Sequence, residues 1–312
     1  MVVIVTGPTA SGKTALSEQL VPYLQGAVIN ADMGQFYTAL TIGTAKPNWQ
    51  ALPFDAYLFD WVDTPRDITV VDFKKAVDNC VLAIQEAHKI PLIVGGSSFY
   101  IKSLFYPPQQ VPFSCPVDMT TFDALSAAQL WDQLYAIDPE RALAIHKTDH
   151  YRLSRALALW HGTGQKPSSL KPLFVMPYKK ILLVVVLPDR AVLTERINMR
   201  NEEMIKSGWV EEAQGLLSTE WQSFVQQKKL IGYTELLSWL TSGAKKNQLR
   251  TVINAINIQT RQYAKRQETF LKKLVKEVAT DAEKAGANLQ IIITHDNSLQ
   301  SVEKIINIIK SS

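Results

Sequence analysis

The chain has 312 residues, of which 46% are hydrophobic and 20% are charged. This composition excludes an intrinsically disordered chain, and the length allows one large α/β domain or a core with an inserted domain. The 33 Lys and Arg residues exceed the 29 Asp and Glu residues by four, with a pI near 8.9. This mild basic excess is compatible with a nucleic-acid partner without requiring one.

The two cysteines, Cys80 and Cys115, lie far apart, without a C-x-x-C motif or a Cys/His cluster. Such spacing favours buried thiols in a reducing compartment over a zinc site or a disulfide framework. The first apolar run is only a strand long, and no run of about 20 apolar residues occurs. We therefore expect a cytoplasmic, monomeric protein with no membrane partner.

A P-loop directly follows the first apolar run and fits the pattern G-x-x-x-x-G-K-[ST]. Its glycines let backbone N–H groups point inward, Lys13 adds a positive charge, and the Thr14 hydroxyl is placed to ligate Mg²⁺ at a helix N-terminus. We expect the loop to bind a run of phosphates; because it contacts no base, it does not name the rest of the ligand. The predicted diphosphate-binding residues are Gly7, Pro8, Thr9, Ala10, Ser11, Gly12, Lys13 and Thr14.

Five short apolar runs predict the strands of a doubly wound parallel sheet, at residues 2–5, 27–29, 91–94, 181–187 and 289–293. The binding crevice of such a sheet lies at the carboxyl ends of its strands. The residues just past each run are therefore candidates for the site. Besides the P-loop, they are Asp32, Gly95, Gly96 and Ser97, and residues 188–190.

Helix-like segments separate these runs. The first should begin near Lys13 and end or kink by Val21, because Pro22 follows. A second, from Asp72, has apolar residues at the i, i+3, i+4 spacing of one buried face. The last long helix, over 249–275, carries basic residues that near a phosphate-binding crevice favour a surface for polyanions over a solvated face. They are Arg250, Arg261, Lys265, Arg266, Lys272 and Lys273.

A proline-rich connector marks a domain boundary, with Pro107, Pro108, Pro112 and Pro116 close together. Short helices are expected beyond it, over 124–137, 139–145 and 149–161, without a strand pattern between them. We interpret residues 112–177 as a helical insertion, and residues 1–111 and 178–312 as an α/β core of the P-loop NTPase type.

In this order, the motifs resemble those of the tRNA dimethylallyltransferases, P-loop enzymes that prenylate N6 of an adenosine beside the anticodon. The resemblance spans nearly the whole chain and is closest to the shorter, bacterial form, since no zinc-finger extension follows the basic helix. Its most family-specific string is Ile-Gly-Thr-Ala-Lys-Pro at 42–47. The other matching stretches are 7–14, Asp32 with 35–37, 95–97 with 100–102, 151–157, Arg196, Arg200, 231–233 and 260–267.

The resemblance implies a role for each matched position. Asp32 would hydrogen-bond the amine of the target adenine and take its proton, and Gln35 would help to hold the flipped base. Lys13, Thr14 with Mg²⁺, and Arg196 or Arg200 would grip the diphosphate of dimethylallyl diphosphate. The implied catalytic residues are Lys13, Thr14, Asp32, Ser97, Arg196 and Arg200. The implied contacts to the tRNA anticodon stem-loop, around position 37, are Asp32, Met33, Gly34, Gln35, Ser97, Tyr151, Arg152, Leu153, Ser154, Arg155, Gly232, Tyr233, Arg261, Lys265 and Arg266.

These roles agree with the chemistry of the reaction. An exocyclic adenine amine is a weak nucleophile, so the allylic carbon must be aligned and the departing diphosphate stabilised by cations and N–H donors. A stacked base cannot react, so the enzyme must extract it, and a helical insertion could help to form the channel that receives it. The chain departs from the usual family pattern at Met33-Gly34, Ala56-Tyr57, Ser97-Ser98 and Ala158.

Three alternatives remain open. An adenylate isopentenyltransferase would share the P-loop and Asp32, but would have little need for the stretches at 151–155 and 261–267. A small-molecule or nucleotide kinase would also fit the strand order, with Asp32 as a base, and would consume ATP. A non-catalytic RNA-binding protein would fit the departures around Asp32.

Overall fold

The computed structural model describes residues 1–109 and 117–310. It divides into two compact units, Met1–Phe105 with Met176–Ser312, and Tyr106–Val175. The sequence places the unit boundaries after residues 111 and 177. The first of these, like Cys115, lies outside the described residues, and the second falls two residues beyond the end of the smaller unit.

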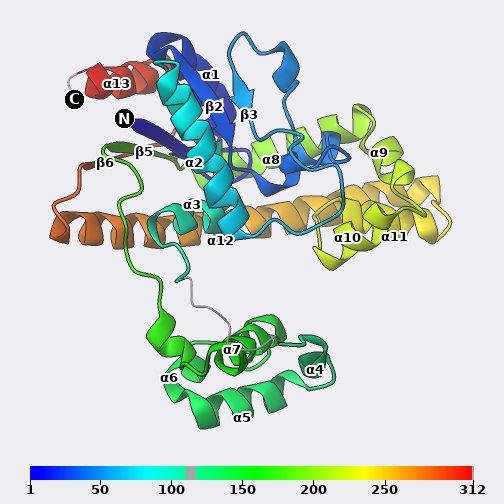
Figure 1. The fold of residues 1–312 in the computed structure, drawn as a ribbon. Helices are drawn as coiled ribbons and strands as arrows, with labels where there is room; N and C mark the ends of the chain where they lie inside the picture. Colours follow the sequence, from blue (N-terminus) through cyan, green and yellow to red (C-terminus); the bar gives the residue numbers. More distant parts are fainter. Residues whose placement is uncertain (110–116, 311–312) are drawn as a thin grey trace. The chain divides into compact units, whose positions relative to one another are not determined.

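The described part of the larger unit contains one six-stranded parallel sheet in the order β3-β2-β4-β1-β5-β6 (Figure 1). The five predicted strands are present, but the predicted number was one short. The missed strand, β3, is a two-residue edge segment, which is too short to show the hydrophobic pattern by which strands are recognised in a sequence. The strands are β1 (Val2–Thr6), β2 (Gly26–Asn30), β3 (Ala56–Tyr57), β4 (Ile90–Gly95), β5 (Ile181–Val186) and β6 (Leu289–Thr294).

The central strands β1 and β5 are buried on both faces, which explains why their sequences are continuous apolar runs. Helices α1 (Lys13–Leu24) and α13 (Leu299–Lys310) lie on one side of the sheet (Figure 1). Helices α2 (Val70–Glu86), α3 (Ser98–Phe105) and α12 (Leu249–Lys284) lie on the other. The parallel pairing of β1, β2 and β4 places their carboxyl ends along one edge of the sheet.

Helices α1 and α12 both extend beyond the predicted ends. Helix α1 does not end at Val21 but continues through Pro22 to Leu24, because Leu20, Val21 and Leu24 all pack into the sheet core. A proline at this point removes only one helical hydrogen bond near the end of the helix. Helix α12 runs to Lys284 rather than 275, since its buried face continues through Val278 and Ala282.

Between the sheet elements, the larger unit adds short helices that frame the strand ends. Helix α2 starts at a capping box between Thr69 and Asp72. The remaining helices are α8 (Arg190–Lys206), α9 (Trp209–Gly215), α10 (Glu220–Gln227) and α11 (Tyr233–Thr241), with 3₁₀ turns η1 (Met33–Phe36), η2 (Ile42–Thr44), η3 (Trp49–Ala51) and η5 (Lys246–Gln248).

The smaller unit is helical in its described part, as expected. Leu130 and Leu134 of α5 pack against Leu153 and Leu157 of α7 in a core of its own. Helix α5 begins at a capping box on Ser126. The helices are α4 (Thr120–Asp123), α5 (Ala127–Ile137), α6 (Pro139–Leu143) and α7 (His150–Thr163), followed by η4 (Pro167–Leu170).

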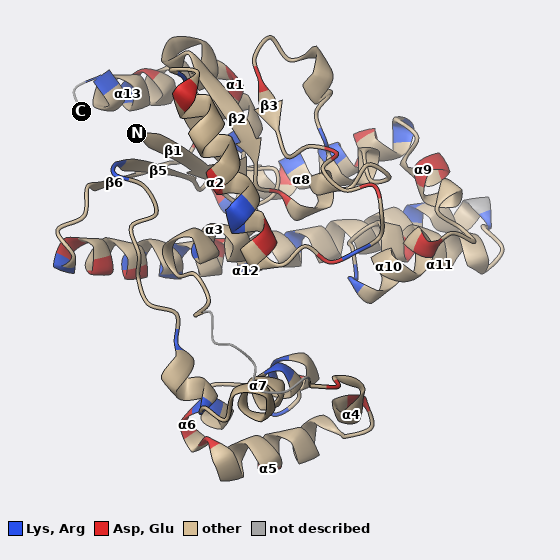
Figure 2. Cartoon of the chain, in the orientation of Figure 1, with Lys and Arg blue, Asp and Glu red and all other residues tan. Residues whose placement is uncertain are grey.

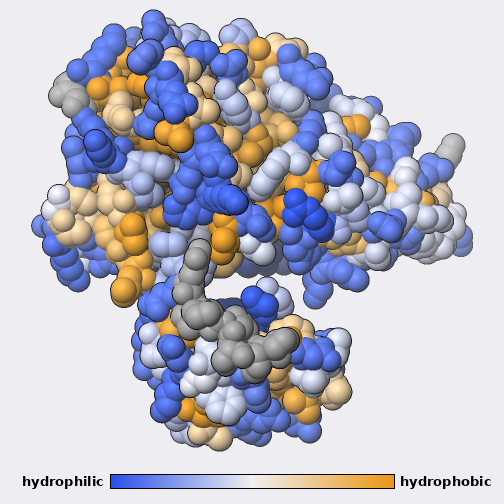
Figure 3. All heavy atoms as spheres, in the orientation of Figure 1, coloured by the Kyte–Doolittle hydropathy of each residue, from blue (hydrophilic) through white to orange (hydrophobic). Residues whose placement is uncertain are grey.

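The visible surface carries mostly hydrophilic side chains with small hydrophobic areas between them (Figure 3). Within residues 1–109 and 117–310, none of the helices has the length and apolar character needed to cross a bilayer. Cys80 is half-buried, and burial raises the pKa of its thiol to about 11. The expected cytoplasmic location and monomeric state stay predictions.

Candidate functional site

The P-loop joins β1 to α1, and two of its glycines are required by the backbone. A Cβ atom on Gly7 would lie 2.5 Å from the Val186 carbonyl oxygen. Gly12 has a φ of 93°, in the left-handed region that side chains disfavour. The loop therefore closes tightly over the end of the sheet and delivers Lys13 and Thr14 to the first turn of α1.

Asp32 lies just past the end of β2 and faces the P-loop. Its Oδ1 accepts a hydrogen bond from the Gly96 N–H at 2.6 Å, and its Oδ2 lies 3.4 Å from Lys13 Nζ. Asn30, the last residue of β2, accepts a hydrogen bond from the Asp32 N–H at 2.9 Å. The structure thus brings together three candidates that are separated in the sequence: the P-loop lysine, the aspartate and the glycine pair after β4.

Ser97 connects the loop after β4 to the turn that follows Asp32. Its Oγ accepts a hydrogen bond from the Met33 N–H at 2.9 Å. The Ser97 hydroxyl therefore holds the backbone of the turn that follows Asp32. Gly95 packs against Ala31 so closely that a Cβ atom would lie 2.2 Å from the Ala31 carbonyl carbon.

Gln267, on α12, was not among the predicted site residues, yet it bridges two walls of the site. Its Nε2 donates to the Gly96 carbonyl at 2.7 Å, and its Oε1 accepts from the Thr9 N–H at 2.9 Å. The side chain is buried. Its only signal in the sequence was its place at the end of the stretch 260–267.

Two arginines of α8 reach the P-loop from outside the sheet. Arg196 Nη1 donates to the Ser11 carbonyl at 3.3 Å, and Arg200 Nη2 donates to Thr9 Oγ1 at 2.6 Å. Desolvation lowers the pKa of the Arg200 guanidinium, and the negative charge of Asp32 opposes that shift. The buried Arg200 Nε has no partner among the described residues. Such a donor beside a P-loop suits an anion.

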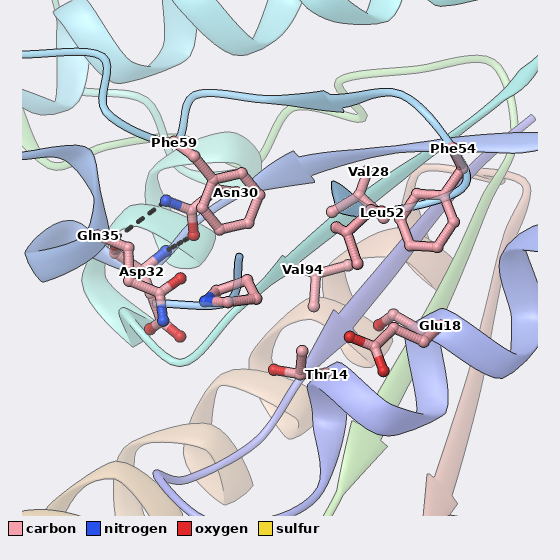
Figure 4. Close-up of a pocket in the computed structure, with 12 residues that line it drawn as sticks. Thr14, Glu18, Val28, Asn30, Asp32, Gln35, Leu52, Phe54, Phe59 and Val94 are labelled. Carbon is pink, nitrogen blue, oxygen red and sulfur yellow. Dashed lines mark hydrogen bonds between the residues drawn. The ribbon is translucent and has the colours of Figure 1, made fainter. Parts of the chain in front are cut away.

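An apolar pocket opens beside Thr14 and Asp32 (Figure 4). Figure 4 shows Asp32 and Gln35 near one end of it, and hydrophobic side chains from β2, β4 and the loop before β3 near the other. Glu18 of α1 also lines it. The hydrophobic lining residues are Val28, Pro47, Leu52, Phe54, Phe59 and Val94.

The donor set near Thr14 fits Mg²⁺ bound partly by substrate. Residues 1–109 and 117–310 contain no cluster of three or more His, Cys, Asp or Glu side chains that could hold a metal ion. Mg²⁺ is commonly held by one or two protein groups together with phosphate oxygens and water. The exposed Thr14 hydroxyl at the start of α1 is the group that would contribute here.

Three of the six basic residues predicted on α12 line a groove between α8 and α12, whereas Arg250 and Lys273 are not among its lining residues. Arg190, Arg261, Lys265 and Lys272 line it. Arg261 Nη1 donates to Asn198 Oδ1 at 2.8 Å, so its side chain is held in place. Figure 2 shows acidic as well as basic positions along α12. Glu268 also lines the groove and pairs with Lys272, so the groove is positive on balance but not uniformly. Arg266 lies outside this lining and is exposed.

The other predicted tRNA contacts differ in how accessible they are. On α7 of the smaller unit, Tyr151 is 73% exposed, and Arg152 and Arg155 are exposed. Leu153 and Ser154 are buried within that unit. In the larger unit, Gly232 has a φ of 88°, and Tyr233 is buried with its hydroxyl directed to Glu212. Gln35 is buried, while Met33 and Gly34 are half-buried.

Comparison with known proteins agrees with this geometry. A family model described as IPP transferase matches residues 35–274. The chain is 33% identical over 275 residues to the tRNA dimethylallyltransferase 1 of Citrifermentans bemidjiense, covering 87% of this chain and 89% of that protein. It is 34% identical over 291 residues to the tRNA dimethylallyltransferase of Sulfurihydrogenibium sp., covering 92% of each.

The chain belongs to the IPP transferase family. Solved structures agree: a full-length tRNA isopentenylpyrophosphate transferase from Bacillus halodurans matches with a TM-score of 0.66 and 27% identity, covering 99% of this chain and 95% of that one. A eukaryotic dimethylallyltransferase acting on tRNA matches with a TM-score of 0.77 and 25% identity, covering 99% of this chain and 79% of that one. The resemblance read from the motifs is thereby confirmed.

Proposed function

We propose that this IPP transferase family member transfers a dimethylallyl group from dimethylallyl diphosphate to N6 of an adenosine at position 37, beside the anticodon of a tRNA, and releases diphosphate. The observation that carries the proposal is the pairing of Lys13 with Asp32, 3.4 Å apart. This distance supports the proposal, because a loop suited to a diphosphate and a carboxylate able to take a proton then share one crevice. A transfer from a diphosphate ester to an amine requires that combination.

On the acceptor side, Asp32 receives the proton. The N6 nitrogen attacks C1 of the allyl group, the C1–O bond breaks, and the bonding electron pair leaves with the diphosphate. Asp32 Oδ1 is held by the Gly96 N–H, so Oδ2 is the oxygen directed at the amine. General-base catalysis of this kind contributes about 10²–10⁴-fold.

On the donor side, cationic groups stabilise the leaving diphosphate. Lys13 and the inward N–H groups of the P-loop meet its oxygens, with Arg196 and Arg200 behind the loop. Mg²⁺ held through Thr14 would neutralise further charge on the diphosphate. We assign the branched hydrocarbon chain to the apolar side chains beside Thr14, among them Val28, Leu52 and Val94, because burial against them would remove its surface from water.

tRNA binding is assigned to basic residues of both units, all of them exposed except the half-buried Arg261. Arg152 and Arg155 on α7, and Arg261 and Lys265 on α12, are suited to phosphate contacts. Because a base cannot react while stacked, the target adenosine must leave its stack to reach Asp32. A transferase acting on free nucleotides would need neither basic segment, and a kinase would not need the apolar pocket.

The direct test is a competition for labelled prenyl groups. Purified protein with Mg²⁺ and labelled dimethylallyl diphosphate is offered total tRNA, AMP and adenosine in parallel. The proposal predicts label in tRNA, retained as N6-modified adenosine after digestion to nucleosides. Label only in AMP would support the free-nucleotide enzyme instead, and ATP hydrolysis coupled to turnover would support a kinase.

A further inference from the structure

Glu212, on α9, lies outside the diphosphate crevice and has no place in the chemistry above, yet its carboxylate accepts four hydrogen bonds. Oε2 accepts from the Thr41 and Ile42 N–H groups at 3.0 and 2.8 Å. Oε1 accepts from the Gly43 N–H at 3.1 Å and from the Tyr233 hydroxyl at 2.5 Å. One side chain, 169 to 171 positions away, thus satisfies the hydrogen-bonding capacity of three consecutive backbone N–H groups at the start of η2.

Close packing around this carboxylate adds to the hydrogen bonds that hold residues 41–43. A Cβ atom on Gly43 would lie 2.0 Å from Trp209 Nε1, and one on Gly232 would lie 2.0 Å from the same indole ring. The ring of Trp209 meets that of Tyr233 edge-on at 5.8 Å. Trp209 of α9 and Tyr233 of α11 therefore pack directly against the backbone of residues 41–43. There is no room for a side chain at Gly43.

The loop held by Glu212, residues 41–45, in turn orients Gln35. Gln35 Nε2 donates to the carbonyls of Thr44 and Ala45, at 3.1 and 3.2 Å. Gly34 packs on Thr44 so closely that a Cβ atom would lie 2.8 Å from its methyl group. Because the amide nitrogen is held by two acceptors, the amide oxygen of Gln35 is the atom presented to a ligand in the pocket that it shares with Asp32.

We propose that Glu212 is a positioning residue for the acceptor base, which it orients through residues 41–45 and Gln35. The inference rests on the proposed function, because it assigns Gln35 to the adenine that receives the prenyl group. Tyr233 takes part in the same arrangement. Burial mainly, and the negative charge of Glu212 next, raise the pKa of its hydroxyl well above the ordinary value, so the hydroxyl remains a hydrogen-bond donor.

Glu212→Gln tests this inference. A glutamine can accept through only one of its two terminal atoms, so donors on the loop would face another donor. We expect kcat/KM for tRNA to fall on the order of tenfold. The KM for dimethylallyl diphosphate and the affinity for inorganic diphosphate should change less than about twofold. Tyr233→Phe, which removes one of the four donors, should give a smaller loss in the same direction.

The matched control is Glu211→Gln, which makes the same change at the exposed neighbouring position. It should leave the kinetic constants for both substrates unchanged. A double-mutant cycle with Gln35→Ala then asks whether Glu212 acts through Gln35. Each single change should cost about tenfold, and the double variant should also lose about tenfold rather than about 100-fold.

Additive losses, or a KM that rises equally for both substrates, would overturn the positioning role, because they would show a general structural effect. A wild-type protein that transfers no prenyl group to tRNA would instead overturn the proposed function. The two failures are therefore distinguishable within one set of assays.

Discussion

Lys13 and Asp32 show how much of the chemistry is set by a few side chains. Lys13 is nearly buried at the first position of α1, and its Nζ lies 3.4 Å from Asp32 Oδ2. In the proposed mechanism, the lysine therefore links the P-loop to the proton acceptor. Its charge would act on both the bound substrate and the leaving group.

The first prediction concerns this lysine. Lys13→Ala should raise the KM for dimethylallyl diphosphate and lower kcat, because the diphosphate carries its charge in the substrate and gains more as it leaves. Steady-state kinetics with each substrate varied in turn would measure both effects. Lys75→Ala, at an exposed position on α2, is the control. Unchanged kinetics in Lys13→Ala would exclude a role in gripping the diphosphate.

The residues of the site differ in how readily the sequence reveals them. Asp32 and Ser97 lie two residues past the ends of β2 and β4, and Lys13 ends the loop that follows β1, so the rule for parallel sheets predicts their convergence. Gln267 has no such signal: it lies in the middle of a long helix, and its hydrogen bond to Thr9 spans 258 positions. Glu212 was missed for the same reason. A polar residue on a helix face looks solvated until its tertiary contacts are known.

At the scale of elements, long periodic segments were predictable and short or interrupted ones were not. The apolar runs of β1 and β5 are buried on both faces, and the sequence shows this directly. Strand β3 has only two residues, and its pairing with β2 depends on tertiary context. Helix α1 continues through Pro22 because burial of Leu24 outweighs the local penalty.

The second prediction concerns the groove between α8 and α12. Replacing Arg261 and Lys265 together with Gln should weaken tRNA binding and reduce the dependence of log Kd on log salt concentration by roughly two ions, because counterion release scales with the number of phosphate contacts. Binding measured by filter assay or fluorescence over a salt series would show it.

The control for this change is a charge-matched pair at the other end of α12. Lys276→Gln with Lys284→Gln removes the same charge from exposed positions outside the groove. If both double variants show the same salt dependence as the wild type, the groove is a solvated face and not a tRNA contact.

At the scale of the whole molecule, several titratable groups are buried or half-buried in their neutral form. Burial raises the pKa of Tyr37 to about 12 and that of Cys80 to about 11. Burial likewise raises the pKa of Tyr100 and of Tyr178. A group whose pKa is higher in the folded state than in the unfolded state stabilises the fold below its unfolded pKa. That contribution is lost as the pH rises through the folded value.

The third prediction follows from this loss of stability at high pH. The free energy of unfolding should decline from about pH 8, as cysteine in the unfolded chain ionises with a pKa of about 8.5, and fall more steeply between about pH 10 and 12 as tyrosines follow. Urea unfolding at pH 8, 9, 10 and 11 would measure it. Cys80→Ala should remove the earlier part of the decline. A midpoint independent of pH up to 11 would contradict the burial of these groups.

The fourth prediction bears on the central claim, that Asp32 takes the proton from an adenine amine in tRNA. Asn is nearly isosteric and can still accept from the Gly96 N–H through its amide oxygen, but it cannot take a proton. The measurement is single-turnover prenyl transfer to tRNA by wild type and Asp32→Asn, with tRNA affinity and thermal unfolding recorded on the same samples.

A loss of about 10²–10⁴-fold in the rate of transfer is expected, the usual range for removing a general base. Affinity for tRNA should survive, since it comes mainly from phosphate contacts elsewhere. Transfer by Asp32→Asn at close to the wild-type rate, with only a lowered melting temperature, would contradict the account and leave Asp32 a structural residue.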